Sequence, residues 1–401
     1  MDVLNAGSGT DAGEPPGAGG RAAEAGQQEP AGQGPGSPSR VRELAPAKVN
    51  LLLRVVGRRA DGYHRLVTVM AALELADELE AMALPDGRAA LLRLEVVGPQ
   101  APRLSATGTA LRERVRLGPE PQLQGPPPGG NLVARAAAAL AHRFGVRRSV
   151  EVVLTKRIPA ASGLGGGSSD AAAALRALAR LWEVPARAAE LEELGAQLGA
   201  DVAFFVRGGV QLATGVGEEL SPLVNRCRAW YVVAVPAQLL STRDVYAEWD
   251  AAPAPTAEDE ALAQAQRLAQ ALERCELAAV EEAMGNDLQG PAVKLYPALR
   301  ELLAAMRGAG LRGVQVSGSG PAAFGLCSGR EQAQQAARRV QGWVARRRMA
   351  VDVFVGRMAA EGDAAGGQES GTMMTGSRGG HDGNGGARSS RGGARRGQGR
   401  A

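Results

Sequence analysis

Lysine is nearly absent from this chain of 401 residues, because only three of its 46 basic residues are lysine: Lys48, Lys156 and Lys294. Arginine fills the other basic positions, which indicates a strong compositional bias. A lysine that persists against such a bias marks a place where a compact ammonium is needed and a forked guanidinium does not fit. We therefore treat the lysines as candidates for function.

Cysteine is also rare, with Cys227, Cys275 and Cys327 far apart and in no metal-binding spacing. This excludes a disulfide framework and a cysteine-based zinc site, and it predicts a reducing, cytoplasmic setting. No apolar run reaches membrane-spanning length and no leader pattern opens the chain, so we expect a protein with no membrane contact. The net charge of +4 gives no strong electrostatic case for nucleic acid.

Large apolar residues are almost missing from both ends of the chain. Residues 1–40 and 359–401 are dominated by small and polar residues and are predicted to be disordered tails. The C-terminal tail carries arginines among glycines, a weak pointer to RNA, but it has no interleaved aromatics and reads as a solvated tail. The length and patterning of the region between the tails predict two domains, residues 41–225 and residues 226–358.

The strongest positive signal is a glycine-rich stretch at residues 159–170, which follows an apolar strand and leads into an alanine-rich helix. Glycines let a backbone approach phosphate oxygens, and the free N–H groups of a helix N-terminus favour an anion. The chain has no Gly-Lys pair, which excludes a P-loop, and the spacing of its glycines does not fit the dinucleotide-binding pattern. The alternative is a capped turn without a ligand.

Two further candidates lie outside this loop. Lys48 and Asn50 fall on the first strand, and Asp201 follows a Gly-Ala pair. Phosphoryl transfer needs a phosphate cradle, a cation and a carboxylate that orients the attacking hydroxyl, and the chain offers one of each. The alternatives are a helix N-cap for Asp201 and a snorkelling strand lysine for Lys48. In the second half, alternating helices and strands predict an α+β domain.

Together these stretches resemble the GHMP small-molecule kinases. The resemblance is carried by five ordered motifs covering about residues 41–358: Pro46-Ala47-Lys48-Val49-Asn50, Asp61-Gly62-Tyr63-His64, residues 158–172, Leu198-Gly199-Ala200-Asp201-Val202 and Ser317-Gly318-Ser319-Gly320. It implies an α+β, two-domain GHMP kinase fold. The N-terminal, ATP-binding domain is expected to be like domain 2 of ribosomal protein S5, and the C-terminal domain to be a ferredoxin-like α/β sandwich.

More narrowly, the motifs are similar to those of the branch that phosphorylates the 2-hydroxyl of 4-diphosphocytidyl-2-C-methyl-D-erythritol in the non-mevalonate route to isopentenyl diphosphate. The resemblance implies that Asp201 accepts the hydroxyl proton and that Lys48 supports this carboxylate. It also implies substrate contacts from Asn50, from Tyr63 and His64 at the cytidine, and from Thr242 near the diphosphate. The implied ATP-binding residues are Pro159, Ala160, Ala161, Ser162, Gly163, Leu164, Gly165, Gly166, Gly167, Ser168 and Ser169.

The resemblance implies ATP and Mg²⁺ as cofactors and the diphosphocytidyl compound as the small-molecule partner. The oligomeric state is expected to be a monomer or a homodimer. Related kinases hold Mg²⁺ with a serine and a glutamate, but no glutamate here stands out, so no metal ligand is assigned. Residues 118–130 form a Pro/Gly-rich insertion that is expected to be a loop, and no role is assigned to it. Two alternatives stay open: another GHMP kinase acting on homoserine or mevalonate, and an inactive RNA-associated scaffold that uses the Arg/Gly tail.

Overall fold

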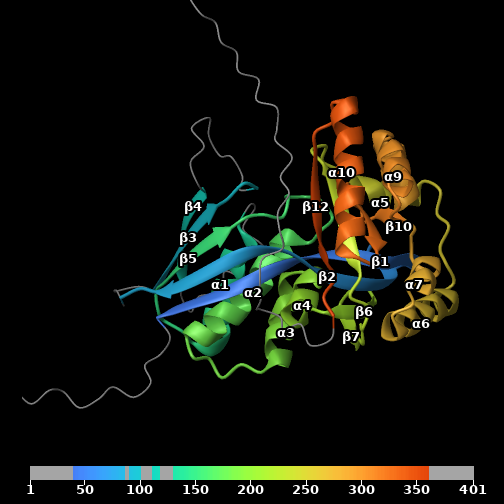
Figure 1. Cartoon of the computed structure of the whole chain (residues 1–401). Helices are drawn as coiled ribbons and strands as arrows, with labels where there is room; N and C mark the ends of the chain where they lie inside the picture. The colour runs from blue at the N-terminus through green and yellow to red at the C-terminus, as the bar shows by residue number, and fades with distance from the viewer. Residues whose placement is uncertain (1–38, 86–89, 101–110, 118–129, 361–401) are drawn as a thin grey trace, which may run out of the picture. The chain divides into compact units, whose positions relative to one another are not determined.

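The computed structural model describes residues 39–85, 90–100, 111–117 and 130–360 (Figure 1). The predicted tails, apart from the residues next to the core, and most of the 118–130 insertion lie outside these ranges. None of the helices in the described ranges combines the length and apolar character needed to cross a membrane.

The first half of the chain builds most of a large sheet with strand order β4-β3-β5-β2-β1-β9, and β6 pairs with both β2 and β7. Burial alternates along β5, so one face of the sheet is covered and the other is more open. The strands are β1 (Arg40–Arg58), β2 (His64–Ala83), β3 (Ala90–Val97), β4 (Leu111–Leu117), β5 (Val150–Thr155), β6 (Val210–Thr214), β7 (Glu219–Leu223) and β9 (Gly285–Asn286).

Four helices belong to this half: α1 (Leu132–Phe144), α2 (Gly166–Leu181), α3 (Ala188–Leu198) and α4 (Ala200–Arg207). Asn131 caps α1 by accepting a hydrogen bond from the N–H of Val133, a role for which asparagine is preferred. The helix α2 is rich in alanine, and its small side chains let it pack closely against α1, α4 and the sheet. This packing fixes the position of the N-terminus of α2 relative to β1.

The second half forms an antiparallel sheet of order β10-β11-β8-β12, made of β8 (Trp230–Pro236), β10 (Arg312–Val316), β11 (Ala323–Cys327) and β12 (Val351–Arg357). With α9 (Ala298–Gly308) and α10 (Arg330–Arg347) it runs β-α-β-β-α-β, which is the ferredoxin-like arrangement expected from the resemblance. The remaining helices are α5 (Thr242–Asp250), α6 (Glu258–Arg274), α7 (Leu277–Ala283) and α8 (Gln289–Leu295).

Three details differ from the sequence-based expectations. The charged stretch over residues 257–284 has the sequence character of one long helix, but it forms two helices, because Cys275 takes a left-handed conformation with φ 56° between α6 and α7. The helix α5 and the strands β4 and β7 were not predicted. Order also continues past the predicted end at residue 358, where the N–H of Ala359 donates to the carbonyl of Ala72 at 2.9 Å.

The two halves share packing. β9 comes from the second half yet pairs in parallel with β1, Leu52 opposite Gly285 and Leu53 opposite Asn286. One core cluster also contains side chains from both halves, among them Val49 and Phe324. The boundary near residue 225 stays a prediction, and this shared packing places the second half against the strand that carries Lys48.

Candidate active site

The glycine loop runs over the N-terminus of α2 and is fastened on two sides. The N–H of Lys48 donates to the carbonyl of Leu164 at 2.9 Å, and the N–H of Ala322 donates to the carbonyl of Ser162 at 2.9 Å. Gly163 and Gly165 have φ of 84° and 73°, a region that favours glycine. The Ser162 hydroxyl is used inside the loop, where it donates to the carbonyl of Pro159.

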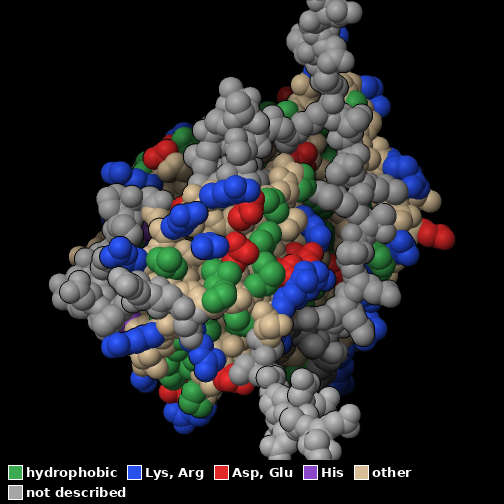
Figure 2. Space-filling view, turned by 90° about the vertical axis from the view of Figure 1, so that its left-hand side faces the viewer, with side chains coloured by type: hydrophobic (Ala, Val, Ile, Leu, Met, Phe, Trp, Pro, Cys, Tyr) green, Lys and Arg blue, Asp and Glu red, His purple; other side chains and the backbone are tan. Residues whose placement is uncertain are grey.

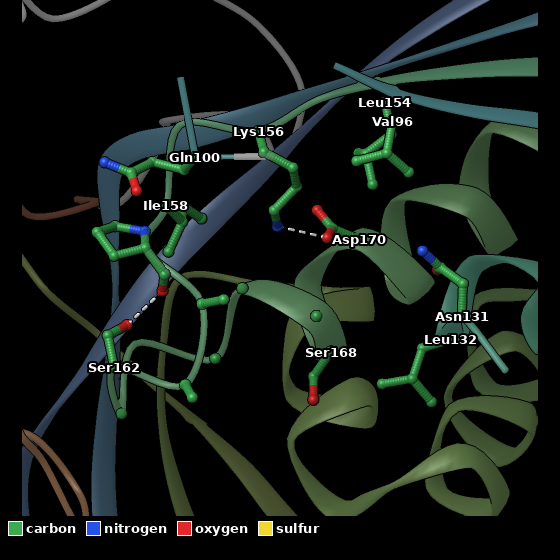
Figure 3. Close-up of a pocket in the computed structure, with 17 residues that line it drawn as sticks. Val96, Gln100, Asn131, Leu132, Leu154, Lys156, Ile158, Ser162, Ser168 and Asp170 are labelled. Carbon is green, nitrogen blue, oxygen red and sulfur yellow. Dashed lines mark hydrogen bonds and ion pairs between the residues drawn. The ribbon is translucent and has the colours of Figure 1, made fainter. Parts of the chain in front are cut away.

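A pocket of about 430 Å³ opens along this loop (Figure 3). Most of the predicted ATP-binding residues line it, namely Pro159 to Gly163 and Gly165 to Ser168, whereas Leu164 and Ser169 are fully buried and do not. The other lining residues were not predicted to bind ATP; they are Val96, Gln100, Asn131, Leu132, Leu154, Lys156, Ile158 and Asp170. The pocket thus joins a backbone cradle suited to phosphates to an apolar region suited to a base.

Lys48 and Asp201 meet beside the loop. The Lys48 ammonium lies 3.8 Å from a carboxylate oxygen of Asp201, with the lysine side chain 6% exposed and the aspartate side chain 40% exposed. The same ammonium donates to the side-chain oxygen of Asn50 at 2.6 Å. Asp201 lies in the first turn of α4, whose N-cap is Gly199, so the N-cap alternative for Asp201 is wrong. The lysine is fixed and the carboxylate is accessible.

The Ser317–Gly320 turn completes this side of the site. The Ser317 hydroxyl donates to the carbonyl of Gly163 at 3.0 Å, and the Asn286 amide donates to the carbonyls of Val316 and Gly318. A Cβ added to Gly318 would lie 3.3 Å from the Asn50 side-chain oxygen. The turn therefore packs directly on the glycine loop and on Asn50.

Thr242 stands at the start of α5, and its hydroxyl lies 2.9 Å from that of Ser319. Further along α5, Tyr246 stacks on His64 with ring centroids 4.5 Å apart. Burial, and after it the charge of Asp201, raises the pKa of the Tyr246 phenol, so α5 extends from the turn into the field of Asp201. Tyr63 is 66% exposed next to His64. The structure thus links Thr242, His64 and Asp201 through one helix.

Sequence reasoning missed a buried charge cluster below the loop. The Lys156 ammonium contacts a carboxylate oxygen of Asp77 and lies 2.6 Å from one of Asp170, and the other Asp77 oxygen accepts from the backbone N–H groups of Arg157 and Ile158. Figure 3 shows Lys156 and Asp170 pointing toward one another beside the loop. The cluster ties the end of β5 to the first turns of α2, so it holds both ends of the cradle.

The buried carboxylates of Asp77 and Asp170 share the Lys156 ammonium, and this arrangement shifts the pKa values of Lys156 and Asp170. Burial alone lowers the pKa of Lys156, but the charges of Asp170 and Asp77 outweigh it and raise that pKa above its ordinary value. Burial raises the pKa of Asp170 from 3.8 to about 8, against the opposing pull of Lys156. The carboxyl of Asp170 therefore binds a proton more tightly in the folded protein than in the unfolded chain.

This shift predicts a pH dependence of stability. The folded-state pKa of Asp170 lies above its unfolded value, so the stability contributed by the protonated form is lost as the pH rises toward and through about 8. Between pH 6 and pH 9 the melting temperature of the wild type should fall more than that of Asp170→Asn, which cannot ionise. Thermal unfolding followed by circular dichroism measures both. Equal losses in the two proteins would contradict the assignment.

Comparisons with known proteins identify the family of this chain. The family model for the GHMP kinases N terminal domain matches residues 131–209, and the model for the GHMP kinases C terminal domain matches residues 268–345. A 4-diphosphocytidyl-2-C-methyl-D-erythritol kinase of Bacillus pumilus is 39% identical over 287 residues, covering 72% of this chain and 88% of the relative. The 4-diphosphocytidyl-2-C-methyl-D-erythritol kinase of Moorella thermoacetica is 37% identical over 300 residues, covering 74% of this chain and 93% of the relative.

Solved structures give the same result. A crystal structure of 4-(cytidine 5'-diphospho)-2C-methyl-D-erythritol kinase is 36% identical in sequence and superposes with a TM-score of 0.61. The match covers 80% of this chain and 100% of the chain in that structure. A homoserine kinase from Cytophaga hutchinsonii superposes with a TM-score of 0.60, and the match covers 81% of this chain and 96% of the homoserine kinase. At 18% sequence identity, this similarity shows only the fold. The chain belongs to the GHMP kinases, in the family of the 4-diphosphocytidyl-2-C-methyl-D-erythritol kinases.

Proposed function

We propose that this enzyme transfers the γ-phosphoryl group of ATP to the 2-hydroxyl of 4-diphosphocytidyl-2-C-methyl-D-erythritol, giving the 2-phosphate and ADP. The reaction is a step of non-mevalonate isopentenyl diphosphate biosynthesis. The main support is the pairing of Lys48 with Asp201 at 3.8 Å beside the glycine loop, in a chain that spans most of relatives named for this activity. The alternative acceptors, homoserine and mevalonate, are supported only by a shared fold.

Asp201 takes the proton of the attacking hydroxyl in this mechanism. The hydroxyl oxygen bonds to the γ-phosphorus, the bond from that phosphorus to the β,γ-bridging oxygen breaks, and ADP leaves. The carboxylate is the accessible member of the pair, so an acceptor can reach it, while Lys48 is held by Asn50. A carboxylate is a weak base, so positioning and charge stabilisation supply most of the acceleration.

The loop residues bind the phosphates of ATP through backbone N–H groups at the N-terminus of α2. We include Mg²⁺ as the cation that travels with ATP and neutralises charge on its phosphates. Within the described ranges no cluster of three or more His, Cys, Asp or Glu side chains could hold a metal alone. Ser169 Oγ is buried without a hydrogen-bond partner among the described residues, and such an oxygen fits a cation shared with phosphates.

On the acceptor side, Asn50 and Thr242 contact the substrate near the reacting end and the diphosphate, and Tyr63 and His64 receive the cytosine. The positions support this division, because Asn50 touches Lys48 and Thr242 touches the Ser317–Gly320 turn. His64 stacks on Tyr246 of α5, and Tyr63 precedes it in the chain. We also propose that the enzyme works in the cytoplasm, where its donor ATP is made.

The RNA-scaffold alternative makes a different prediction. Figure 2 shows acidic side chains among the basic ones on one face of the molecule. Arg40, Arg112 and Arg157 each pair with a glutamate. Removing residues 361–401 should leave kcat and KM within about two-fold of the full chain, because the site is built from the core. Loss of function on this truncation, with the core still folded, would support the scaffold.

The product identifies the reaction. The purified protein, ATP, Mg²⁺ and the diphosphocytidyl substrate should give one new phosphomonoester, which ³¹P and ¹³C NMR should place on the oxygen of the carbon that bears the methyl group. Phosphorylation at another hydroxyl would contradict the proposed reaction while leaving the kinase family intact.

A further inference from the structure

His64 sits in a pocket made by one face of α5. Its ring stacks on Tyr246 and meets the edge of Trp249 at a centroid distance of 5.5 Å. Its Nε2 lies 2.8 Å from an oxygen of Asp250. Because Tyr246, Trp249 and Asp250 follow Thr242 at helical spacing, they lie along one face, and they fix both the plane of the imidazole and the partner of one of its nitrogens.

The Asp250 carboxylate determines which nitrogen carries the proton. A neutral imidazole has one N–H donor and one acceptor nitrogen, and an ionised carboxylate can only accept. Nε2 must therefore be the donor, which leaves Nδ1 as an acceptor. The other Asp250 oxygen lies 3.5 Å from the guanidinium of Arg58, so a positive charge supports the ionised carboxylate. Among the described residues, none forms a hydrogen bond with Nδ1.

An acceptor nitrogen at this place can read a pyrimidine. Cytosine presents an exocyclic amine, which is a donor, where uracil presents a carbonyl oxygen, which is an acceptor. Nδ1 of His64 would bond to the amine and oppose the carbonyl, and a site that leaves a buried polar group unpaired rejects the wrong ligand strongly. The exposed ring of Tyr63, next in the chain, offers a face on which a base can stack.

We propose that Asp250 is the positioning residue that makes the enzyme select cytidine over uridine, through the tautomer of His64. This inference depends on the proposed function, since it takes the diphosphocytidyl compound as the acceptor. Asp250 does not touch the base. It acts by keeping the proton on Nε2, and Tyr246 and Trp249 keep the ring in its plane.

Kinetics with two acceptors test this role. The wild type should use the cytidine substrate with a kcat/KM at least about 10²-fold above that of its uridine analogue. In Asp250→Asn the amide can accept from or donate to Nε2, so either tautomer forms, and this preference should shrink about ten-fold or more. Glu258→Gln is the matched control, because Glu258 pairs with Arg65, the neighbour of His64, and its loss should leave the preference unchanged.

A measurement without turnover keeps the two proposals separate. The chain has three histidines, so ¹⁵N NMR of labelled protein at pH 8.5 can be assigned with His142→Gln and His381→Gln. It should show the proton of His64 on Nε2 in the wild type and a mixture in Asp250→Asn. A proton on Nδ1 in the wild type, or an unchanged base preference in folded Asp250→Asn, would overturn the inference. A wild type inactive on the cytidine substrate would instead contradict the proposed function.

Discussion

Asp201→Asn is expected to lower kcat by about 10²- to 10⁴-fold, the range that general-base catalysis by a positioned side chain supplies. The amide keeps the shape of the carboxylate but cannot take a proton from the attacking hydroxyl. Asp201 is on the surface of the first turn of α4, so the melting temperature should stay within a few degrees of the wild type. Stopped-flow or coupled ADP-release assays measure the rate.

Lys48→Met should give a loss of similar size for a different reason. The ammonium is buried between Asn50 and Asp201, and its removal leaves both oxygens without their cation. Lys294→Met is the matched control, since Lys294 is 71% exposed and pairs only with Glu248 among the described residues. If Asp201→Asn and Lys48→Met both kept activity within a few-fold of the wild type, neither residue could belong to the mechanism.

The second large effect is expected from Gly165→Ala. Gly165 has φ of 73°, and a Cβ there would lie 2.7 Å from the buried ring of Phe205 and 3.2 Å from Cγ of Lys48. Strain and collision together should cost about 1–3 kcal/mol. Because the same atoms shape the cradle and place Lys48, the KM for ATP should rise at least ten-fold and kcat should fall as well.

A neighbouring glycine separates this collision from a general effect of the substitution. Gly167 has the normal helical conformation, and a Cβ there would meet only Leu132 at 3.8 Å. Gly167→Ala should therefore match or exceed the wild type in thermal stability, by up to about 1 kcal/mol, because alanine is the better helix residue. A melting temperature of Gly165→Ala equal to that of Gly167→Ala would show that the close contact with Phe205 does not exist.

The parts of the site that sequence could predict have local signatures. The glycine loop is recognisable because a strand, glycines and a helix follow one another within a short stretch. Lys48 stands out because lysine is so rare, and Asp201 because it follows Gly199-Ala200. The structure brings these three features together, as the requirements of phosphoryl transfer led us to expect.

The parts that sequence could not predict depend on contacts between distant residues. Lys156 was visible as a rare lysine, but its partners are 79 and 14 residues away, and nothing in the pattern around Asp77 points to it. Only the tertiary fold joins them. The helical spacing of Tyr246, Trp249 and Asp250 was a usable signal for α5, but the pattern cannot show that this face meets His64.

The identity of the acceptor is the central claim, and one competition tests it most directly. Cytidine-diphospho-methylerythritol, homoserine and mevalonate are mixed at equal concentrations with limiting ATP, Mg²⁺ and the full chain, and the phosphorylated products are separated and quantified by mass spectrometry. We predict that almost all of the transferred phosphate appears on the diphosphocytidyl substrate, and that the initial rate of its appearance falls at least about 10²-fold when Asp201→Asn replaces the wild type. Preferential phosphorylation of homoserine or mevalonate would contradict the account.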